Sequence, residues 1–148
     1  MISIGILCTL TISLTHGQTS SVFNKPATGV SLGAVVQPSS SPVHKGVPTD
    51  ITITFLTLRL GQRGGSTLQP HVDYDATIIK HGKQEFQLSA LTGQLGQPLH
   101  SDGGIAIFPY TFQQRGGYIV NITVYGILFN PIRPDSTISH QRNLIGFG

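Results

Sequence analysis

The sequence predicts an all-β protein, an antiparallel immunoglobulin-like or Greek-key β-sandwich of about seven strands. Glycine (18 residues) and proline (9 residues) are plentiful, whereas only 10% of the 148 residues are charged. This composition favours turns and strands over helices. Apolar and polar residues alternate along several short segments, and turn-forming residues separate these segments at the spacing of a sandwich. The length fits one domain.

The clearest single strand begins after a turn at residues 45–50, where isoleucine and phenylalanine alternate with threonine over residues 51–55. Residues 71–89 predict a hairpin whose tight turn is His81-Gly82. In its first strand the apolar positions alternate with polar ones, so we expect Asp73 and Asp75 on the solvated face. Glycine-rich loops are expected at residues 61–69 and 92–104.

Two further strand segments follow, at residues 105–112 and 118–129. Pro109 lacks an N–H group, so it should lie at a sheet edge, a bulge or a strand end. Tyr118 follows two glycines at the start of a strand, as the tyrosine of a tyrosine corner does. We therefore expect a structural role for Tyr118, with its hydroxyl bound to nearby backbone.

The N-terminus has the features of an export signal followed by a mature chain. Residues 2–14 form an apolar stretch of signal-peptide length, and cleavage is expected after Gly17, although no basic residue precedes Lys25. A core β-strand is the alternative interpretation of this stretch. We divide the chain into a signal peptide (1–17), a Ser/Pro-rich segment with a possible edge strand at 30–36 (18–47), a β-sandwich domain (48–135) and a tail (136–148).

The segments HVDYDATIIKHGKQEF and LHSDGGIAIFPYTFQQRGGYIVNITVYGILFNPIRPD resemble a module of exported proteins of ammonia-oxidising archaea (thaumarchaea). The shared features are a His-Val-Asp-Tyr strand, a Gly-Lys turn, a Leu-His element and a Gly-Tyr strand that ends in Gly-Ile-x-Phe-x-Pro. The resemblance covers residues 71–135. It implies an immunoglobulin-like sandwich at the cell surface or in the pseudo-periplasm, and it implies no defined activity.

His71, Asp73 and His100 are the candidate metal ligands, because imidazole and carboxylate groups suit zinc or copper(II). His71 and Asp73 are expected on one strand face and His100 at the start of the following strand pair, where Asp75 and Asp102 could assist. The alternative is that these are ordinary polar groups at strand ends and in loops. A type 1 copper site needs cysteine, and the single cysteine, Cys8, lies in the predicted leader.

Other motifs carry little chemistry. Asn121-Ile122-Thr123 is an N-glycosylation sequon, although it falls in mid-strand. No serine stands in a nucleophile elbow, and the Gly-rich run 61–65 lacks the Lys-Ser or Lys-Thr of a phosphate-binding loop. No catalytic residues are expected.

The sequence thus predicts a non-catalytic extracytoplasmic module, secreted or at the cell surface, with a structural or binding role in the cell envelope. Its partner would be an envelope protein or a glycan. The alternative function is a small copper or zinc carrier that uses histidine and aspartate ligands. Basic residues are scattered, so nucleic acid is not an expected partner. The mature chain is expected to have no stable membrane span.

Overall fold

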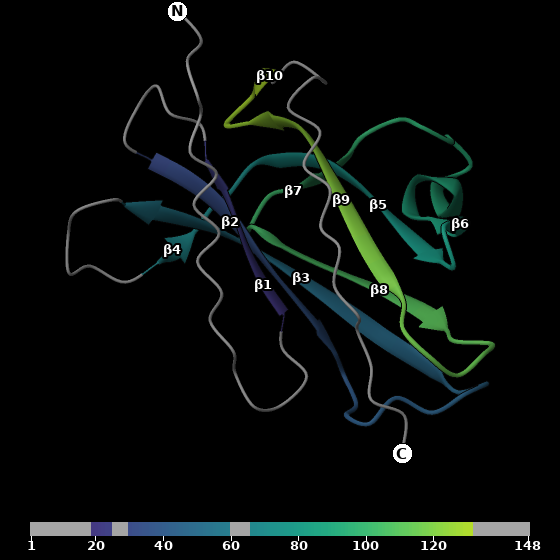
Figure 1. The fold of residues 1–148 in the computed structure, drawn as a ribbon. Coiled ribbons are helices and arrows are strands. Elements are labelled where there is room, and N and C mark those ends of the chain that lie inside the picture. Colours follow the sequence, from purple (N-terminus) through teal and green to yellow (C-terminus); the bar gives the residue numbers. More distant parts are fainter. Residues whose placement is uncertain (1–18, 25–29, 60–65, 132–148) are drawn as a thin grey trace, which may run out of the picture.

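A computed structural model of the chain describes residues 19–24, 30–59 and 66–131. Its strands form two antiparallel sheets that face each other (Figure 1). The first sheet contains β1 (Thr19–Asn24), β2 (Val30–Pro38), β3 (Pro48–Arg59), β4 (Thr67–Leu68) and β8 (Ile105–Thr111). The second contains β5 (Val72–Lys80), β6 (Lys83–Gln87), β7 (Leu99–Ser101), β9 (Ile119–Ile127) and β10 (Asn130–Pro131). The predicted all-β fold class is confirmed, with ten strands among the described residues.

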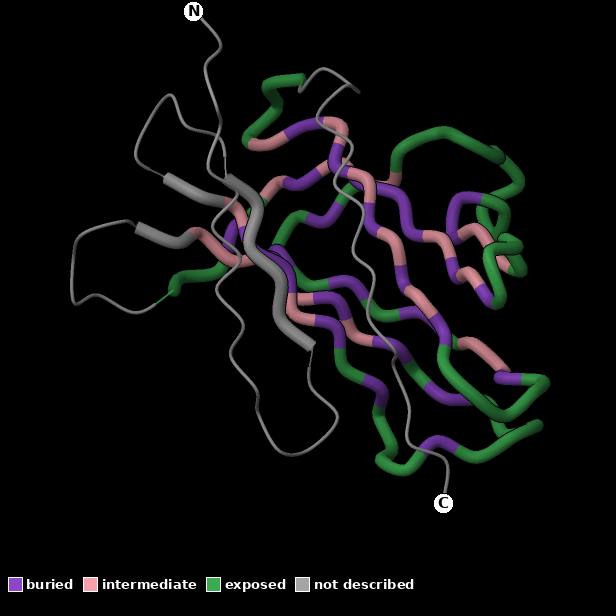
Figure 2. Tube along the Cα trace, in the orientation of Figure 1, coloured by how far each residue is buried: buried purple, intermediate pink, exposed green. Residues whose placement is uncertain are grey.

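The core lies between the two sheets and is built by alternation along the strands. Buried and partly buried residues alternate strictly along β9, and purple and pink alternate along its tube in Figure 2. β3 contributes Ile51, Ile53 and Phe55, all at most 1% exposed, and the Phe55 ring lies 5.1 Å from that of Tyr74 on β5. Removal of this apolar surface from water is the main stabilising contribution to the sandwich.

The predicted hairpin is present as β5 and β6. His81 and Gly82 connect the two strands and have φ angles of 49° and 75°. Two consecutive positive φ angles define a type I′ turn, whose twist matches that of the paired strands. The hairpin therefore forms within the residues predicted for it.

β2 differs from expectation in its place in the first sheet, and β8 shows which of its residues face the core. β2, which was expected at a sheet edge, lies between β1 and β3. In β8, Ala106 and Phe108 face the core, while Ile105 and Ile107 are 47% and 65% exposed. Among the described strands β8 pairs with β3 alone, so Pro109 occupies an edge strand, as its missing N–H group requires.

Asp75 was expected on a solvated face, and this expectation is wrong. Its side chain is 3% exposed, because the 3₁₀ helix η1 (Leu88–Thr92) lies beside this part of β5. The carboxylate accepts hydrogen bonds from the N–H and the hydroxyl of Ser89, at 3.0 and 2.8 Å, and from the side chain of Gln87 at 2.6 Å. A buried carboxylate needs such donors, and here it fixes η1 against the second sheet.

Tyr118 is fully buried and immediately precedes β9. Its hydroxyl accepts a hydrogen bond from the N–H of Gln114 and donates one to the carbonyl of the same residue, both at 3.1 Å. The buried ammonium of Lys80 lies 3.9 Å from the centre of the Tyr118 ring and donates to the Arg115 carbonyl. These contacts hold the turn before β9 against the end of β5.

The predicted signal peptide (1–17) and tail (136–148) lie outside the described residues. Within the part of the chain that the structure describes, no helix has the length and apolar character needed to cross a bilayer.

Gly104 should be far less tolerant of substitution than its neighbour Gly103. It has a φ angle of 75°, and a Cβ there would overlap the Gln69 carbonyl, whereas a Cβ on Gly103 would meet nothing within 4 Å. We expect Gly104→Ala to lower the free energy of unfolding by more than about 2 kcal/mol, and Gly103→Ala to change it by less than about 0.5 kcal/mol. Urea denaturation of the two variants measures this difference, and equal effects would contradict the close approach of Gly104 to Gln69.

Candidate metal centre

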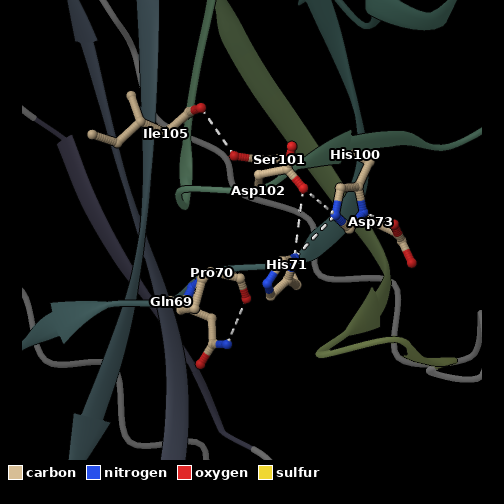
Figure 3. Close-up of polar contacts among 8 residues, drawn as sticks. All are labelled: Gln69, Pro70, His71, Asp73, His100, Ser101, Asp102 and Ile105. Carbon is tan, nitrogen blue, oxygen red and sulfur yellow. Dashed lines mark hydrogen bonds and ion pairs between the residues drawn. The ribbon is translucent and has the colours of Figure 1, made fainter.

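Two segments of the chain, residues 71–73 and 100–102, meet at one end of the second sheet and bring His71, Asp73, His100 and Asp102 together (Figure 3). His71 immediately precedes β5, Asp73 is its second residue, His100 is the middle residue of β7, and Asp102 follows β7. Asp73 and His100 are direct partners in the antiparallel register of β5 and β7. Strand pairing therefore places these two side chains side by side.

His71 is held by backbone contacts on both sides. Its N–H donates to the carbonyl of Asp102 at 3.2 Å, and its carbonyl accepts from the N–H of Leu128 at 2.8 Å. Its φ angle is 52°, so it lies before β5 in a left-handed conformation and not within the strand as expected. The buried hydroxyl of Ser101 donates to the Ile105 carbonyl at 2.9 Å, which closes the turn that carries Asp102 (Figure 3).

Three potential ligand atoms converge at this end of the sheet. Nδ1 of His71 lies 3.3 Å from Nε2 of His100. Oδ1 of Asp102 lies 3.1 Å from the same Nε2 and 3.6 Å from Nδ1 of His71. One atom from each of the three residues thus lies close enough to the other two for all three to bind a single metal ion.

Asp73 binds the opposite side of the His100 ring. Its Oδ1 accepts a hydrogen bond from Nδ1 of His100 at 2.6 Å. In the neutral ring, a proton on Nδ1 leaves Nε2 with its lone pair directed at His71 and Asp102. Proteins commonly orient a ligating imidazole in this way, with a carboxylate on the ring nitrogen that does not bind the metal.

Gly126 provides the space that Asp73 occupies. It is the partner of Asp73 in the pairing of β5 with β9. A Cβ at this position would lie 2.6 Å from Oδ2 of Asp73. Any larger residue at 126 would therefore displace the carboxylate from His100.

Phe129 covers the two imidazole rings. Its ring centre lies 4.5 Å from that of His71 and 5.6 Å from that of His100, although its side chain remains 72% exposed. Phe129 and Leu128 connect β9 to β10 with φ angles of 62° and 50°. Such turns normally use asparagine or glycine, because other residues are strained at positive φ.

The structure brings the three expected residues, His71, Asp73 and His100, into one cluster. The role of Asp73 differs from the expected one, because its carboxylate contacts the far nitrogen of His100 and Asp102 takes the place facing Nε2. Asp75 is buried beneath η1 and takes no part. Gly126 and Phe129 were not found from the sequence, because their contribution arises only from strand pairing and from the conformation of a distant turn.

Asn121, the predicted glycosylation site, lies in the middle of β9. Its side-chain Oδ1 is buried and has no hydrogen-bond partner among the described residues. Glycosylation at Asn121 stays a prediction.

The hydrogen bond to Asp73 raises the pKa of the His100 imidazole above its ordinary value, and the charges of Asp73 and Asp102 add to this effect. Protonated His100 therefore stabilises the metal-free fold at pH values below the ordinary histidine pKa. This contribution is lost as the pH rises through the raised pKa of the folded state.

Removal of the Asp73 charge should lower the pKa of His100. We expect Asp73→Asn and Gly126→Ala to lower it in the metal-free protein, the first by removing the charge and the second by displacing the carboxylate. Gly103→Ala, which adds a methyl group in open space, is the control. NMR titration of the histidine ring protons measures the change, and an unaltered His100 pKa in Asp73→Asn would contradict the contact.

No protein-family model, no curated protein and no solved structure matches this chain.

Proposed function

We propose that this protein is a non-catalytic module that binds a divalent transition metal, zinc or copper(II), through His71, His100 and Asp102. The observation that carries the proposal is the convergence of two imidazole nitrogens and one carboxylate oxygen at separations of 3.1 to 3.6 Å. Imidazole and carboxylate are common ligands of both metals.

The contact between Asp73 and His100 argues against a chance meeting of surface side chains. A surface histidine has no need of a second carboxylate behind it, whereas a ligating histidine usually has one. Here the strand register and the absence of a side chain at Gly126 together provide that carboxylate. About a third of the side-chain surface of His71, His100 and Asp73 is exposed, so each side chain is partly covered by its neighbours.

Backbone strain in the same region also supports a functional site. Four non-glycine residues of the described chain have positive φ angles, and three of them, His71, Leu128 and Phe129, build this cluster. Each such residue costs roughly 1 to 2 kcal/mol, and strain of this kind concentrates at functional sites. The fourth, His81, belongs to the β5–β6 turn.

We also propose an immunoglobulin-like fold and an extracytoplasmic location, with an envelope protein or glycan as partner. The pairing of β3 with β8 and of β5 with β9, together with the Tyr118 hydroxyl bound four residues upstream, supports this fold. The apolar leader at residues 2–14 and the resemblance over residues 71–135 support the location. Fractionation of the native cells with an antibody against the folded domain tests it, and a purely cytoplasmic signal would contradict it.

Metal binding should require both histidines. We expect the purified protein to bind one zinc or copper(II) ion per chain in calorimetric titrations, and elemental analysis should give the same ratio. His71→Asn and His100→Ala should each abolish stoichiometric binding. Asparagine is chosen at position 71 because it tolerates the positive φ angle found there.

His44→Ala is the matched control, because His44 is exposed in a loop and does not belong to the cluster. Urea denaturation of every variant separates loss of binding from loss of folding. Absence of binding in the natural sequence, or unchanged binding by both His71→Asn and His100→Ala, would show that the cluster is not a metal site.

A further inference from the structure

We infer that the cluster is built for a tetrahedral ion, zinc in preference to copper(II), and that it leaves the fourth coordination position open to a ligand from outside the chain. This inference rests on the proposed function, because it specifies the ion and the coordination of the same site.

The separations between the three ligand atoms fit tetrahedral coordination. With metal–ligand bonds of about 2.05 Å, a tetrahedron places neighbouring ligand atoms about 3.3 Å apart. The observed separations are 3.3 Å between the two nitrogens, and 3.1 and 3.6 Å from these nitrogens to Oδ1 of Asp102. The three ligand atoms thus lie near three corners of a tetrahedron.

The same separations fit copper(II) less well. Copper(II) favours square-planar or tetragonal coordination, whose right angles place adjacent ligand atoms only about 2.8 Å apart at bonds of about 2.0 Å. Three ligands in a square plane form two adjacent pairs and one opposite pair about 4.0 Å apart. Two pairs in the cluster would therefore have to close by several tenths of an ångström, and the third would have to open. The backbone bond from His71 to Asp102 ties together the two segments that carry the ligands, and it opposes such a movement.

The fourth position is not filled by Asp73. Its Oδ1 lies on the Nδ1 side of the His100 ring, whereas the metal would lie on the Nε2 side. Asp73 could reach the ion only by giving up its bond to His100. Within the described residues, the group of potential ligands contains His71, His100 and Asp102 and no fourth member.

The open position faces solvent. The side chain of Asp102 is 87% exposed, and those of His71 and His100 are about one-third exposed. The exposed apolar side chain of Phe129 borders the same place. A water molecule or a donor atom from another molecule can therefore complete the tetrahedron, and a zinc ion held in this way is available for exchange.

Cobalt(II) titration of the metal-free, full-length protein tests the geometry, because tetrahedral cobalt(II) absorbs visible light much more strongly than octahedral cobalt(II). We expect intense visible bands at one cobalt ion per chain, and we expect zinc to abolish them by displacement. Added imidazole should shift the bands, since it can enter the fourth position. Weak, octahedral-type bands, or intense bands that imidazole leaves unchanged, would overturn the inference.

Variants assign the individual roles. Asp102→Asn should weaken the intense bands and reduce zinc affinity, whereas Asp73→Asn should keep tetrahedral bands and lower affinity by roughly 10- to 100-fold, as loss of a partner behind a ligating histidine does. Asp50→Asn is the control, because Asp50 is an exposed residue of β3 in the first sheet and does not belong to the cluster. It should change neither the cobalt bands nor the zinc affinity. If Asp73→Asn instead abolished the tetrahedral bands, Asp73 would be a ligand and the fourth position would not be open.

The outcomes for this inference and for the proposed function are distinct. Failure of zinc, copper(II) and cobalt(II) to bind at all would contradict the metal site itself. Binding of one ion with an octahedral or tetragonal spectrum would leave the metal site in place and contradict only the tetrahedral, open coordination. Electron paramagnetic resonance of the copper(II) form separates these results, because it reports the geometry of bound copper directly.

Discussion

The register of β5 is the constraint on which the second sheet and the candidate metal centre both depend. Side chains alternate between the two faces of a strand, so burial of Val72, Tyr74 and Ala76 turns Asp73 to the opposite face. There it lies between His100 on β7 and Gly126 on β9. A slip of one residue would expose the core side chains and would also separate Asp73 from His100. Packing of the core residues of β5 thus fixes the position of Asp73, although Asp73 itself is not a core residue.

Much of the fold could be predicted from local sequence because each strand carries its own alternating pattern. The β5–β6 hairpin and the burial of Ile51, Ile53 and Phe55 follow from such patterns. Asp75 shows the limit of this reasoning. It occupies a polar position of an alternating strand, yet η1 covers it and supplies the donors that a buried carboxylate needs. Which part of the chain covers a sheet face is a tertiary property that a strand pattern does not contain.

The candidate site was predictable in composition and less so in arrangement. His71, Asp73 and His100 could be selected because they are metal-binding residue types near the ends of predicted strands. The exchange of roles between Asp73 and Asp102 depends on which nitrogen of His100 each carboxylate faces. That choice follows from strand register and from the turn after β7, and neither is visible in residue identities. The contribution of Gly126 also depends on strand register, because Gly126 leaves space for the carboxylate of Asp73.

The contacts within the cluster explain how the three proposed metal ligands are held close together. Two imidazoles and two carboxylates lie within polar contact of one another, and Asp73 accepts a hydrogen bond from Nδ1 of His100 while His71 and Asp102 face Nε2 of the same ring. These contacts hold the three proposed ligand atoms at nearly the separations that a tetrahedral ion requires. The strain of the left-handed residues His71, Leu128 and Phe129 is borne during folding, so the proposed binding of an ion would not have to supply it. A metal site organised in this way would give up little binding free energy to rearrangement, and its exposed side would allow the ion to leave.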